Sequence, residues 1–581
     1  MDSAQRRQRA INITYVTVLI LGVWNIIVFS LYGIDKLKAK RNRSRISEKT
    51  LLFATLMMGG VGTLLGMYAF RHKTKHAKFK IGVPLLLVVN IVVVVAIMLF
   101  VGNGDGSDVT TEISLPEVLV AANERRDNII KPDYNQLLAL TAGRTPTTEN
   151  LAPFQEQMRR LRFIPKSDAI ADVHDFFGLM RDLYGGYVYF GGDEVFSAIL
   201  DDIIADIEAH RGNNIGRSAF ERILHTHLSA VIVDNHFTIG NQRFSRSSAF
   251  YHAPDGLVFV RGYQGFRSAN TERYLVEAEG HKIDDIMRLH VTGTGQFVYS
   301  PVILRIDENL PSRLTIAFVY DDGTRENIVF RRENTRRRRH QEPSLQYIEG
   351  IPVVTVRQMD FPESTARRSA DARAFLSFAE VLRAEPVVIV DIRSNGGGNG
   401  NLPARWLHVL TGEIVPTNHV WLRAWDYEEN LAAIRTATPE SPFYSPEEIF
   451  RRYMNPAPFG DGYMIMGNAP DRIIERDQLL VLLVDRFTAS AAEGFADKAL
   501  NMQNTLIIGS HTGGVLNFDL TWPSLRMPRS GVPLGMGTAM IVHPYGHLVE
   551  GVGIAPDIWV HGDALDAAIA MLGLNNDGIL R

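Results

Sequence analysis

Cysteine is absent from this sequence of 581 residues. Its absence excludes disulfide bonds, thiolate metal sites and a cysteine nucleophile, although it does not fix the compartment. A large excess of charge is also absent, because the formal net charge is −3. The whole chain therefore has no polyelectrolyte character, and we do not expect nucleic acid as a partner. The length exceeds that of a single domain and favours about three or four of them.

Uncharged stretches that are both long and strongly apolar have no counterpart after residue 104, but three of them precede it, over residues 10–33, 51–70 and 81–104. Each has about 20 or more residues, which is enough for a helix to cross roughly 30 Å of hydrocarbon. A cleaved signal peptide has one shorter apolar core, so three stretches in tandem predict a retained, multi-pass domain in the bacterial cytoplasmic membrane over residues 1–104. No acidic or basic residue lies inside the three stretches, which gives a proton or ion path no support.

The connections between these stretches are basic, with seven Lys or Arg over residues 35–49 and five over residues 71–80. If all three stretches span the membrane, these charges divide between its two sides and the positive-inside rule gives no orientation. If the glycine-rich middle stretch is re-entrant, both connections are cytoplasmic and the C-terminal part lies outside, which is the orientation we favour. The second connection is either a solvated loop or a contact with anionic lipid headgroups, so membrane lipid is a candidate partner.

Residues 20–95 resemble a family of small bacterial membrane proteins of unknown function. The resemblance is carried by Tyr32–Leu52, by the glycine-rich middle stretch and by Phe70–Phe79. It implies no activity.

After residue 104, the predicted secondary structure changes twice along the chain. Residues 105–244 show mostly helical periodicity, whereas residues 245–340 are β-rich, with a candidate hairpin at Asp322–Gly323. Over residues 341–581 short apolar runs alternate with helical patterns, which predicts an α/β domain with a largely parallel sheet. The arginine run at residues 336–339 is either a solvated linker or an electropositive patch that holds a substrate carboxylate.

Ser490 follows one of these apolar runs, at a predicted corner between a strand and a helix. A side chain there lies beside free N–H groups and the positive end of the helix dipole, which favours an oxyanion on an attacked carbonyl. Serine is also a favoured helix cap, so the residue is either a nucleophile or a cap.

The glycine-rich segment Asp391–Gly400 follows another predicted strand. No lysine follows the glycines, so the segment does not match a phosphate-binding motif. It is either a loop that donates N–H groups to an oxyanion or a flexible turn.

A serine nucleophile needs a base, and an imidazole base needs a partner. His236 follows an apolar, strand-like run and has polar neighbours, which makes it a candidate base. Glu550 is a carboxylate in an otherwise apolar, glycine-flanked segment, and buried carboxylates are rarely without a role. By itself, neither residue is a specific signal.

Four segments together resemble the tail-specific, or carboxyl-terminal processing, serine peptidases. They are VIVDIRSNGGG, VLLVDRFTASAAEGFADKAL, IIGSHTGG and LVEGVGIAPDIWV. One branch of that family uses a lysine base, but Thr512–Val515 occupies the corresponding place here and contains no lysine. The other branch resembles the catalytic core of tricorn protease and uses a histidine base that a glutamate supports. This branch implies that His236 takes the proton of Ser490, with Glu550 behind it.

The same resemblance implies an oxyanion hole formed by the N–H of Ala491 and the N–H of Gly396 or Gly397. Asn235 occupies the position where the tricorn-like branch has a serine, which puts the hydrogen bonding behind the histidine in doubt. The resemblance also implies a divergent PDZ-like domain over residues 245–340. A linker and helical segment bearing the histidine would precede it over residues 105–244, and the peptidase core would follow over residues 341–581.

We therefore predict a membrane-anchored serine endopeptidase that cleaves peptides, unfolded proteins or protein tails through an acyl-enzyme. The prediction requires no metal or organic cofactor and leaves the oligomeric state open. The alternative is a non-catalytic, membrane-tethered module on the same fold that binds a ligand or a peptide.

Overall fold

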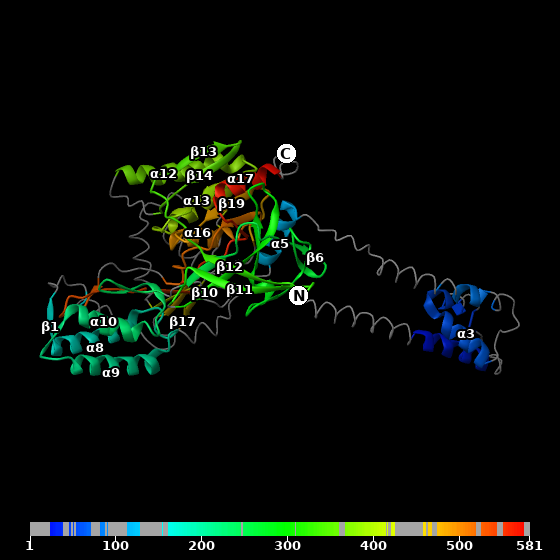
Figure 1. Cartoon of the computed structure of the whole chain (residues 1–581), viewed down its shortest axis with the longest axis horizontal. Helices are drawn as coiled ribbons and strands as arrows, with labels where there is room; N and C mark the ends of the chain where they lie inside the picture. Colours follow the sequence, from blue (N-terminus) through cyan, green and yellow to red (C-terminus); the bar gives the residue numbers. More distant parts are fainter. Residues whose placement is uncertain are drawn as a thin grey trace. The chain divides into compact units, whose positions relative to one another are not determined.

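The structure is a computed structural model of the chain (Figure 1). It describes residues 24–38, 46–47, 50–51, 54–70, 79, 82–87, 90, 113–127, 154, 161–245, 248–307, 309–359, 366–413, 415, 420–424, 457–459, 463–466, 473–518, 525–537, 539–542 and 550–574. The chain divides into two compact units, which are Met1–Thr111 with Arg261–Arg267, and Glu112–Val260 with Ser268–Arg581. Each unit is described by itself.

In the first unit, a helix over residues 24–38 packs against the π-helix η1 (Thr55–Gly59) and the α-helix α3 (Gly60–Ala69). Gly62 permits this close packing, because a Cβ there would lie 2.1 Å from the main-chain oxygen of Asn25. Within the described residues, no helix is both long and apolar enough to cross a membrane. Two of the predicted membrane stretches extend beyond the described residues, over residues 10–23 and 91–104.

The second unit confirms the predicted, largely parallel sheet. Its central strands lie in the order β13 (Ser344–Ile348), β14 (Ile351–Thr355), β15 (Val387–Asp391), β19 (Leu479–Val484), β20 (Thr505–Gly509), β24 (Ile558–Trp559) and β9 (Met287–Val291). Every pairing from β14 to β9 is parallel, and β13 is antiparallel to β14. Strands β15 and β19 are buried along their whole length, as expected for a parallel sheet covered on both faces.

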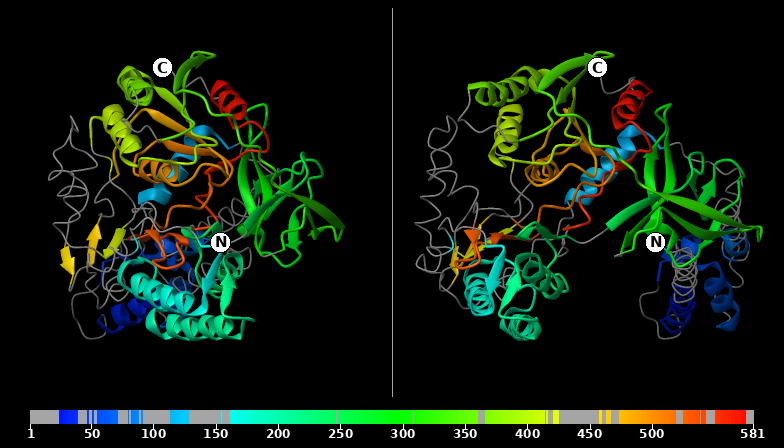
Figure 2. Two further views of the ribbon diagram at one scale, coloured as in Figure 1. Left: turned by 90° about the vertical axis from the view of Figure 1, so that its left-hand side faces the viewer. Right: turned by 60° about the vertical axis from the view of Figure 1, so that its left-hand side comes forward.

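Helices cover both faces of this sheet, as the orange strands and flanking helices of Figure 2 show. One face carries α12 (Ala366–Val381), the 3₁₀-helix η3 (Leu382–Ala384), α13 (Asn401–Thr411) and α16 (Ala491–Ala499), and the other carries α5 (Leu115–Asp127) and α17 (Ala564–Leu574). Side chains of β15 alternate between the two apolar cores, with Val388 and Val390 in one and Val387 and Ile389 in the other. This alternation follows from the two-residue period of a strand.

The β-rich residues continue the same sheet beyond β9. The strands there are β10 (Phe297–Ile306), β5 (Ser248–His252), β12 (Arg325–Arg332), β11 (Arg313–Tyr320) and β8 (Leu275–Ala278), with helix α11 (Ile283–Ile286) beside them. Strands β6 (Phe259–Gly262) and β7 (Gly265–Ser268) pair with each other, and Arg261–Arg267, which runs through both, belongs to the first unit. The predicted hairpin at Asp322–Gly323 is confirmed, because it joins β11 to β12 and Gly323 has a φ of +82°. The PDZ-like assignment and the domain limits stay predictions, and the limit at residue 104 lies outside the described residues.

The helical part before residue 230 contains α8 (Lys166–Leu183), α9 (Gly192–Ala209) and α10 (Arg217–Leu228), which lie together in Figure 1. Strands β1 (Phe163–Pro165) and β2 (Asn214–Gly216) pair beside these helices. A four-stranded sheet joins β3 (Asp234–Ile239) and β4 (Gln242–Phe244) to β21 (Leu525–Arg526) and β22 (Pro533–Gly535). Another contains β16 (Val420–Ala424), β17 (Ala457–Phe459), β18 (Tyr463–Met466) and β23 (Ala539–Val542).

The prediction that a strand ends before His236 is wrong. Residues 231–233 form no strand, and β3 begins at Asp234. The apolar run has another cause, because Ile232 is 1% exposed and packs into the core under the helices. His236 therefore lies within a strand and not after one.

Candidate active site

Ser490 lies at the corner between β19 and α16, as predicted. Its φ of +54° is one that non-glycine residues rarely adopt, and such strain costs about 1–3 kcal/mol. The next residue, Ala491, begins the helix, where N–H groups have no acceptor within the helix. The corner therefore presents a half-buried hydroxyl beside main-chain donors, an arrangement suited to a nucleophile.

Glu493 is completely buried behind this corner and accepts four hydrogen bonds. The N–H of Ser490 donates at 3.0 Å, the N–H groups of Gly514 and Val515 donate at 2.8 Å each, and the hydroxyl of Thr512 donates at 2.5 Å. Burial raises the pKa of Glu493, and the hydrogen bonds oppose that rise. One carboxyl group thus connects the turn that holds the serine to the loop that follows β20.

The glycine-rich loop after β15 packs directly on Ser490. Gly397 has a φ of +95°, and a Cβ there would lie 2.8 Å from the Cβ of Ser490. Asn395 joins the two loops, because its main-chain oxygen accepts the N–H of Ala489 at 2.9 Å. Only glycine fits at position 397 without moving the serine.

The predicted oxyanion donors differ in where their N–H groups lie. The N–H of Ala491 is at the helix start, whereas the N–H of Gly397 donates to Oδ1 of Asn395 at 3.0 Å. Gly396 precedes it and lines a cavity of about 310 Å³ together with Arg337. The oxyanion hole stays a prediction, and within it the Gly397 N–H already has an acceptor.

Asn235 connects Glu550 to the serine loops. Its N–H donates to Oε1 of Glu550 at 2.7 Å, and its side-chain Nδ2 donates to the main-chain oxygen of Gly514 at 2.7 Å. Because Gly514 in turn donates to Glu493, a continuous chain of hydrogen bonds leads from Glu550 to Ser490. The tertiary structure thus brings three of the predicted residues into one network.

Glu550 is buried, as expected, but its carboxylate has main-chain partners. Oε1 accepts the N–H of Asn235, and Oε2 accepts the N–H of Asn517 at 3.0 Å. Burial and then the charge of Asp234 raise the pKa of Glu550 to about 8, against the effect of these two hydrogen bonds. The expected support of the His236 imidazole by Glu550 stays a prediction.

Asp234 determines the local course of the strand that carries His236. Its Oδ1 accepts the N–H of His236 at 2.7 Å and the N–H of Phe237 at 3.1 Å, while Oδ2 accepts the hydroxyl of Tyr184 at 3.1 Å. Burial and then the charge of Asp234 raise the pKa of Tyr184 well above its usual range. Tyr184 therefore remains a proton donor to this carboxylate at all physiological pH values.

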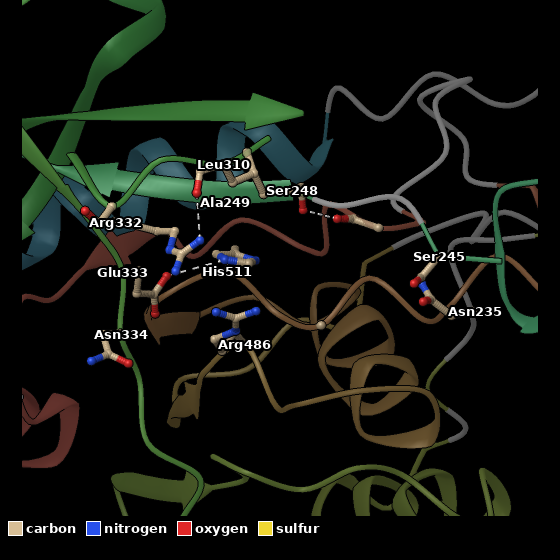
Figure 3. A pocket seen from close by; sticks show the side chains of 13 residues that line it. Asn235, Ser245, Ser248, Ala249, Leu310, Arg332, Glu333, Asn334, Arg486 and His511 are labelled. Atoms are coloured by element: carbon tan, nitrogen blue, oxygen red, sulfur yellow. Dashed lines mark hydrogen bonds and ion pairs between the residues drawn. The ribbon is translucent and has the colours of Figure 1, made fainter. Parts of the chain in front are cut away.

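A cavity of about 650 Å³ adjoins these loops (Figure 3). Asn235 and Ser245 lie at one end of it, Arg332 and Glu333 lie at the other, and His511 lies between them. Nε2 of His511 is 3.4 Å from Oε2 of Glu333. The cavity thus extends from the predicted catalytic residues to the segment that follows β12.

Sequence reasoning missed Glu493 and Asp234. The spacing from Ser490 to Glu493 is that of a capping box, which was a usable signal for the first of them. No comparable local signal marks Asp234. Among the described residues, no group of three or more His, Cys, Asp or Glu side chains could hold a metal ion.

Comparisons with known families match two parts of the chain. Residues 353–560 match the model of Peptidase family S41. Residues 25–79 match a family described as protein of unknown function, DUF1294. The uncharacterized protein YsdA of Bacillus subtilis (strain 168) is 50% identical over 70 residues, which are 12% of this chain and 79% of that protein.

Solved structures are similar at low sequence identity. Mature CPAF complexed with lactacystin is 13% identical, with a TM-score of 0.38, over 71% of this chain and 97% of that chain. The photosystem II D1 C-terminal processing protease is 12% identical, with a TM-score of 0.33, over 71% of this chain and 98% of that chain. Tricorn protease is 12% identical, with a TM-score of 0.30, over 71% of this chain and 37% of that chain.

Proposed function

This chain belongs to peptidase family S41 and carries an N-terminal DUF1294 domain, and we propose that it is an endopeptidase with Ser490 as nucleophile and His236 as base. The observation that carries the proposal is the chain of hydrogen bonds from Glu550 through Asn235, Gly514 and Glu493 to Ser490. This network supports the proposal because it joins the strand that carries His236 to the turn that carries Ser490, although the two residues are 254 positions apart in the chain.

Acylation begins when the imidazole of His236 accepts the proton of the Ser490 hydroxyl. The Oγ of Ser490 then forms a bond to the carbonyl carbon of the substrate, and the carbonyl oxygen becomes an oxyanion. The imidazolium donates its proton to the leaving amine as the peptide C–N bond breaks. The product of this half-reaction is an ester between the substrate acyl group and Ser490.

Deacylation repeats these steps with water. His236 accepts a proton from the water, whose oxygen attacks the ester carbonyl, and the proton then returns to Oγ of Ser490. The substrate leaves with a new carboxylate, and the enzyme regains its starting state.

We assign the oxyanion hole to the N–H groups of Ala491 and Gly396. Ala491 supplies the first N–H of a helix, where the dipole also favours negative charge. Gly396 is favoured over Gly397 because the N–H of Gly397 donates to Asn395. Removal of one donor from such a site costs about 10²–10³-fold in kcat.

We also propose that the N-terminal part attaches the peptidase to a bacterial membrane, with the peptidase outside the cytoplasm and peptides or protein tails as substrates. The support is the three uncharged stretches and the two basic connections of the sequence. A reporter enzyme fused after residue 108 tests the side of the membrane. Reporter activity restricted to the cytoplasm would reverse the orientation.

Labelling by a fluorophosphonate tests the nucleophile, because the reagent requires an activated serine. We expect the reagent to label the wild type and not Ser490→Ala. We also expect kcat/KM on an unfolded protein substrate to fall about 10⁴-fold or more in both Ser490→Ala and His236→Ala. The control is Ser377→Ala, at an exposed position on α12. Full activity of either active-site variant would exclude the assignment, and an inert but folded wild type would favour the binding module.

A further inference from the structure

The segment after β12 carries a cationic surface that extends from the β-rich strands to the serine loops. It lines a cavity of about 980 Å³ whose walls include seven arginines and only three acidic residues. This balance contrasts with the net charge of −3 for the whole chain. We name this surface the arginine track and define it by Arg313, Arg331, Arg336 and Arg337.

The track begins with two arginines that face each other across neighbouring strands. Arg313 of β11 is the direct partner of Arg331 in β12, and Arg331 is in turn the partner of His252 in β5. Direct partners of this kind point to the same face, with Cβ atoms about 4.5–5.5 Å apart, and like charges there are destabilising. All three side chains line the cavity. The strands thus hold two positive charges in a position that disfavours folding.

No carboxylate within the described part of the chain neutralises the track. Of the three acidic residues in the walls, Glu333 lies beside His511 and Asp485 accepts hydrogen bonds from Ser394. The third, Asp255, is exposed and has no ion pair with the four arginines of the track among the described residues. Arg313, Arg331, Arg336 and Arg337 have no ion pair among the described residues, and all four are exposed. Among the described residues, the four guanidinium groups are therefore exposed and available to an anionic ligand.

The track leads to the nucleophile. The N–H of Arg338 donates to Oγ of Ser394 at 2.9 Å, which holds this segment against the loop after β15. Arg337 lies beside Gly396, with Nη2 3.3 Å from the position of a Cβ on that residue. The neighbouring Gly397 contacts Ser490. Arg337 is the sixth residue after Arg331, so this part of the track spans at most about 20 Å, or the length of about six extended substrate residues.

We propose that the arginine track binds acidic side chains of the substrate, so that this peptidase prefers polypeptides with a cluster of Asp or Glu within about six residues of the cleaved bond. The proposal rests on the assignment of Ser490 as nucleophile, because that residue gives the track its position relative to the cleaved bond. Arg supplies paired donors that match carboxylate geometry, and several of them in a row select a run of acids over a single one.

Binding to the full-length Ser490→Ala protein tests this preference without catalysis. The probes are fluorescent peptides with a run of Glu, Gln or Lys, all with an amidated C-terminus so that side-chain carboxylates alone are compared. We expect the Glu peptide to bind about tenfold more tightly than the Gln peptide at low salt, and the advantage to shrink as salt screens the charges. Equal binding of the Glu and Gln peptides would overturn the proposal, as would tighter binding of a single-stranded oligonucleotide than of the Glu peptide.

The Arg313→Gln substitution distinguishes a role of Arg313 in binding acidic peptides from a role in stabilising the fold. The substitution removes the like-charge pair on β11 and β12, so we expect a higher Tm. Because the other three arginines of the track remain, we also expect the preference for Glu over Gln peptides to fall by about threefold. The matched control is Arg211→Gln, an exposed arginine that lines none of these three cavities and leaves the preference unchanged. A lower Tm with an unchanged preference would show that Arg313 serves the fold. Peptide binding is measured on the inactive Ser490→Ala protein, so its result does not depend on whether Ser490 is the nucleophile. Fluorophosphonate labelling of the wild type tests that assignment separately.

Discussion

The main-chain N–H of Ser490 donates to the carboxylate of Glu493 at 3.0 Å, within the first turn of the same helix. That carboxylate also accepts N–H groups from Gly514 and Val515, which belong to the loop after the next strand. The backbone of the proposed nucleophile is therefore held, through its N–H, by a buried carboxyl group. The position of Ser490 depends on two loops and not on its own turn alone.

Glu493→Gln tests this dependence. A glutamine replaces one acceptor oxygen by an NH₂ group, which faces N–H donors and leaves at least one of them unsatisfied, at a cost of about 1–3 kcal/mol. We expect a lower Tm and a lower kcat with KM nearly unchanged, measured by thermal unfolding and peptide hydrolysis. Glu380→Gln, at an exposed position on α12, is the control. A normal kcat in Glu493→Gln would show that the position of Ser490 does not depend on the hydrogen bonds to the Glu493 carboxylate.

Gly397→Ala tests the contact between the glycine-rich loop and the nucleophile. The new Cβ lies 2.8 Å from the Cβ of Ser490 and 2.7 Å from the oxygen of Ala489, so one of the two loops must move. Because a displacement of about 1 Å in an active site can cost about 100-fold, we expect a loss of that order in kcat.

Gly400→Ala is the matched control for this substitution. Position 400 has an ordinary φ of −65°, and a Cβ there meets nothing within 4 Å. We therefore expect wild-type activity from Gly400→Ala. Equal activity of the two variants would contradict the packing of the loop on the serine.

The pH dependence of activity tests the role of Glu550. Burial, followed by the charge of Asp234, raises its pKa to about 8, so a large part of the group is protonated at neutral pH and ionises as the pH rises. If the ionised form supports the imidazolium, kcat/KM rises up to a pH near 8, above the ordinary His pKa of about 6.5. Glu550→Gln cannot ionise, so we expect a lower maximum and a midpoint that moves toward about 6.5. A midpoint that is the same in both proteins would exclude this role.

Asp391 should make the fold sensitive to acid. Burial alone would raise its pKa, but hydrogen bonds from Arg357 and Arg393 outweigh burial and lower it to about 2, from an ordinary value of 3.8. Because the folded-state pKa is lowered, the ionised form stabilises the fold above about pH 4, and this stabilisation of about 2 kcal/mol is lost as the pH falls through 2. Urea unfolding measured from about pH 5 down to about pH 2 follows the loss, because this range runs from above the ordinary Asp pKa of about 3.9 to the lowered pKa of Asp391.

Asp391→Asn should remove much of this acid dependence. It also removes the carboxylate that the buried Arg357 and Arg393 share, so we expect it to be destabilised by about 3–5 kcal/mol near neutral pH. The control is Asp201→Asn, an exposed aspartate on α9, which should keep the acid dependence of the wild type. An equally steep loss in Asp391→Asn would assign the acid sensitivity to other carboxylates.

Local patterns were enough to predict much of this fold. The fully apolar runs at β15 and β19 predicted buried parallel strands, because such strands lie between two layers of helices. The corner at Ser490 was predicted from the apolar run of β19 and the helical pattern after it, and the hairpin was predicted from its turn residues Asp322–Gly323. The prediction of a strand that ends before His236 was wrong, because a short apolar run from which Ile232 enters a helical core resembles a short buried strand.

By itself, the sequence determined the order of strands, turns and helices and the residue types at each strand end, since these depend on periodicity within a few residues. Only the tertiary structure decided that Asn235 reaches Glu550, 315 residues away, and that Glu493 holds the loop after β20. Likewise, only strand register places Arg313 opposite Arg331. These contacts depend on which distant segments pack together, and packing is decided by the shape and burial of the whole core, which no local pattern contains.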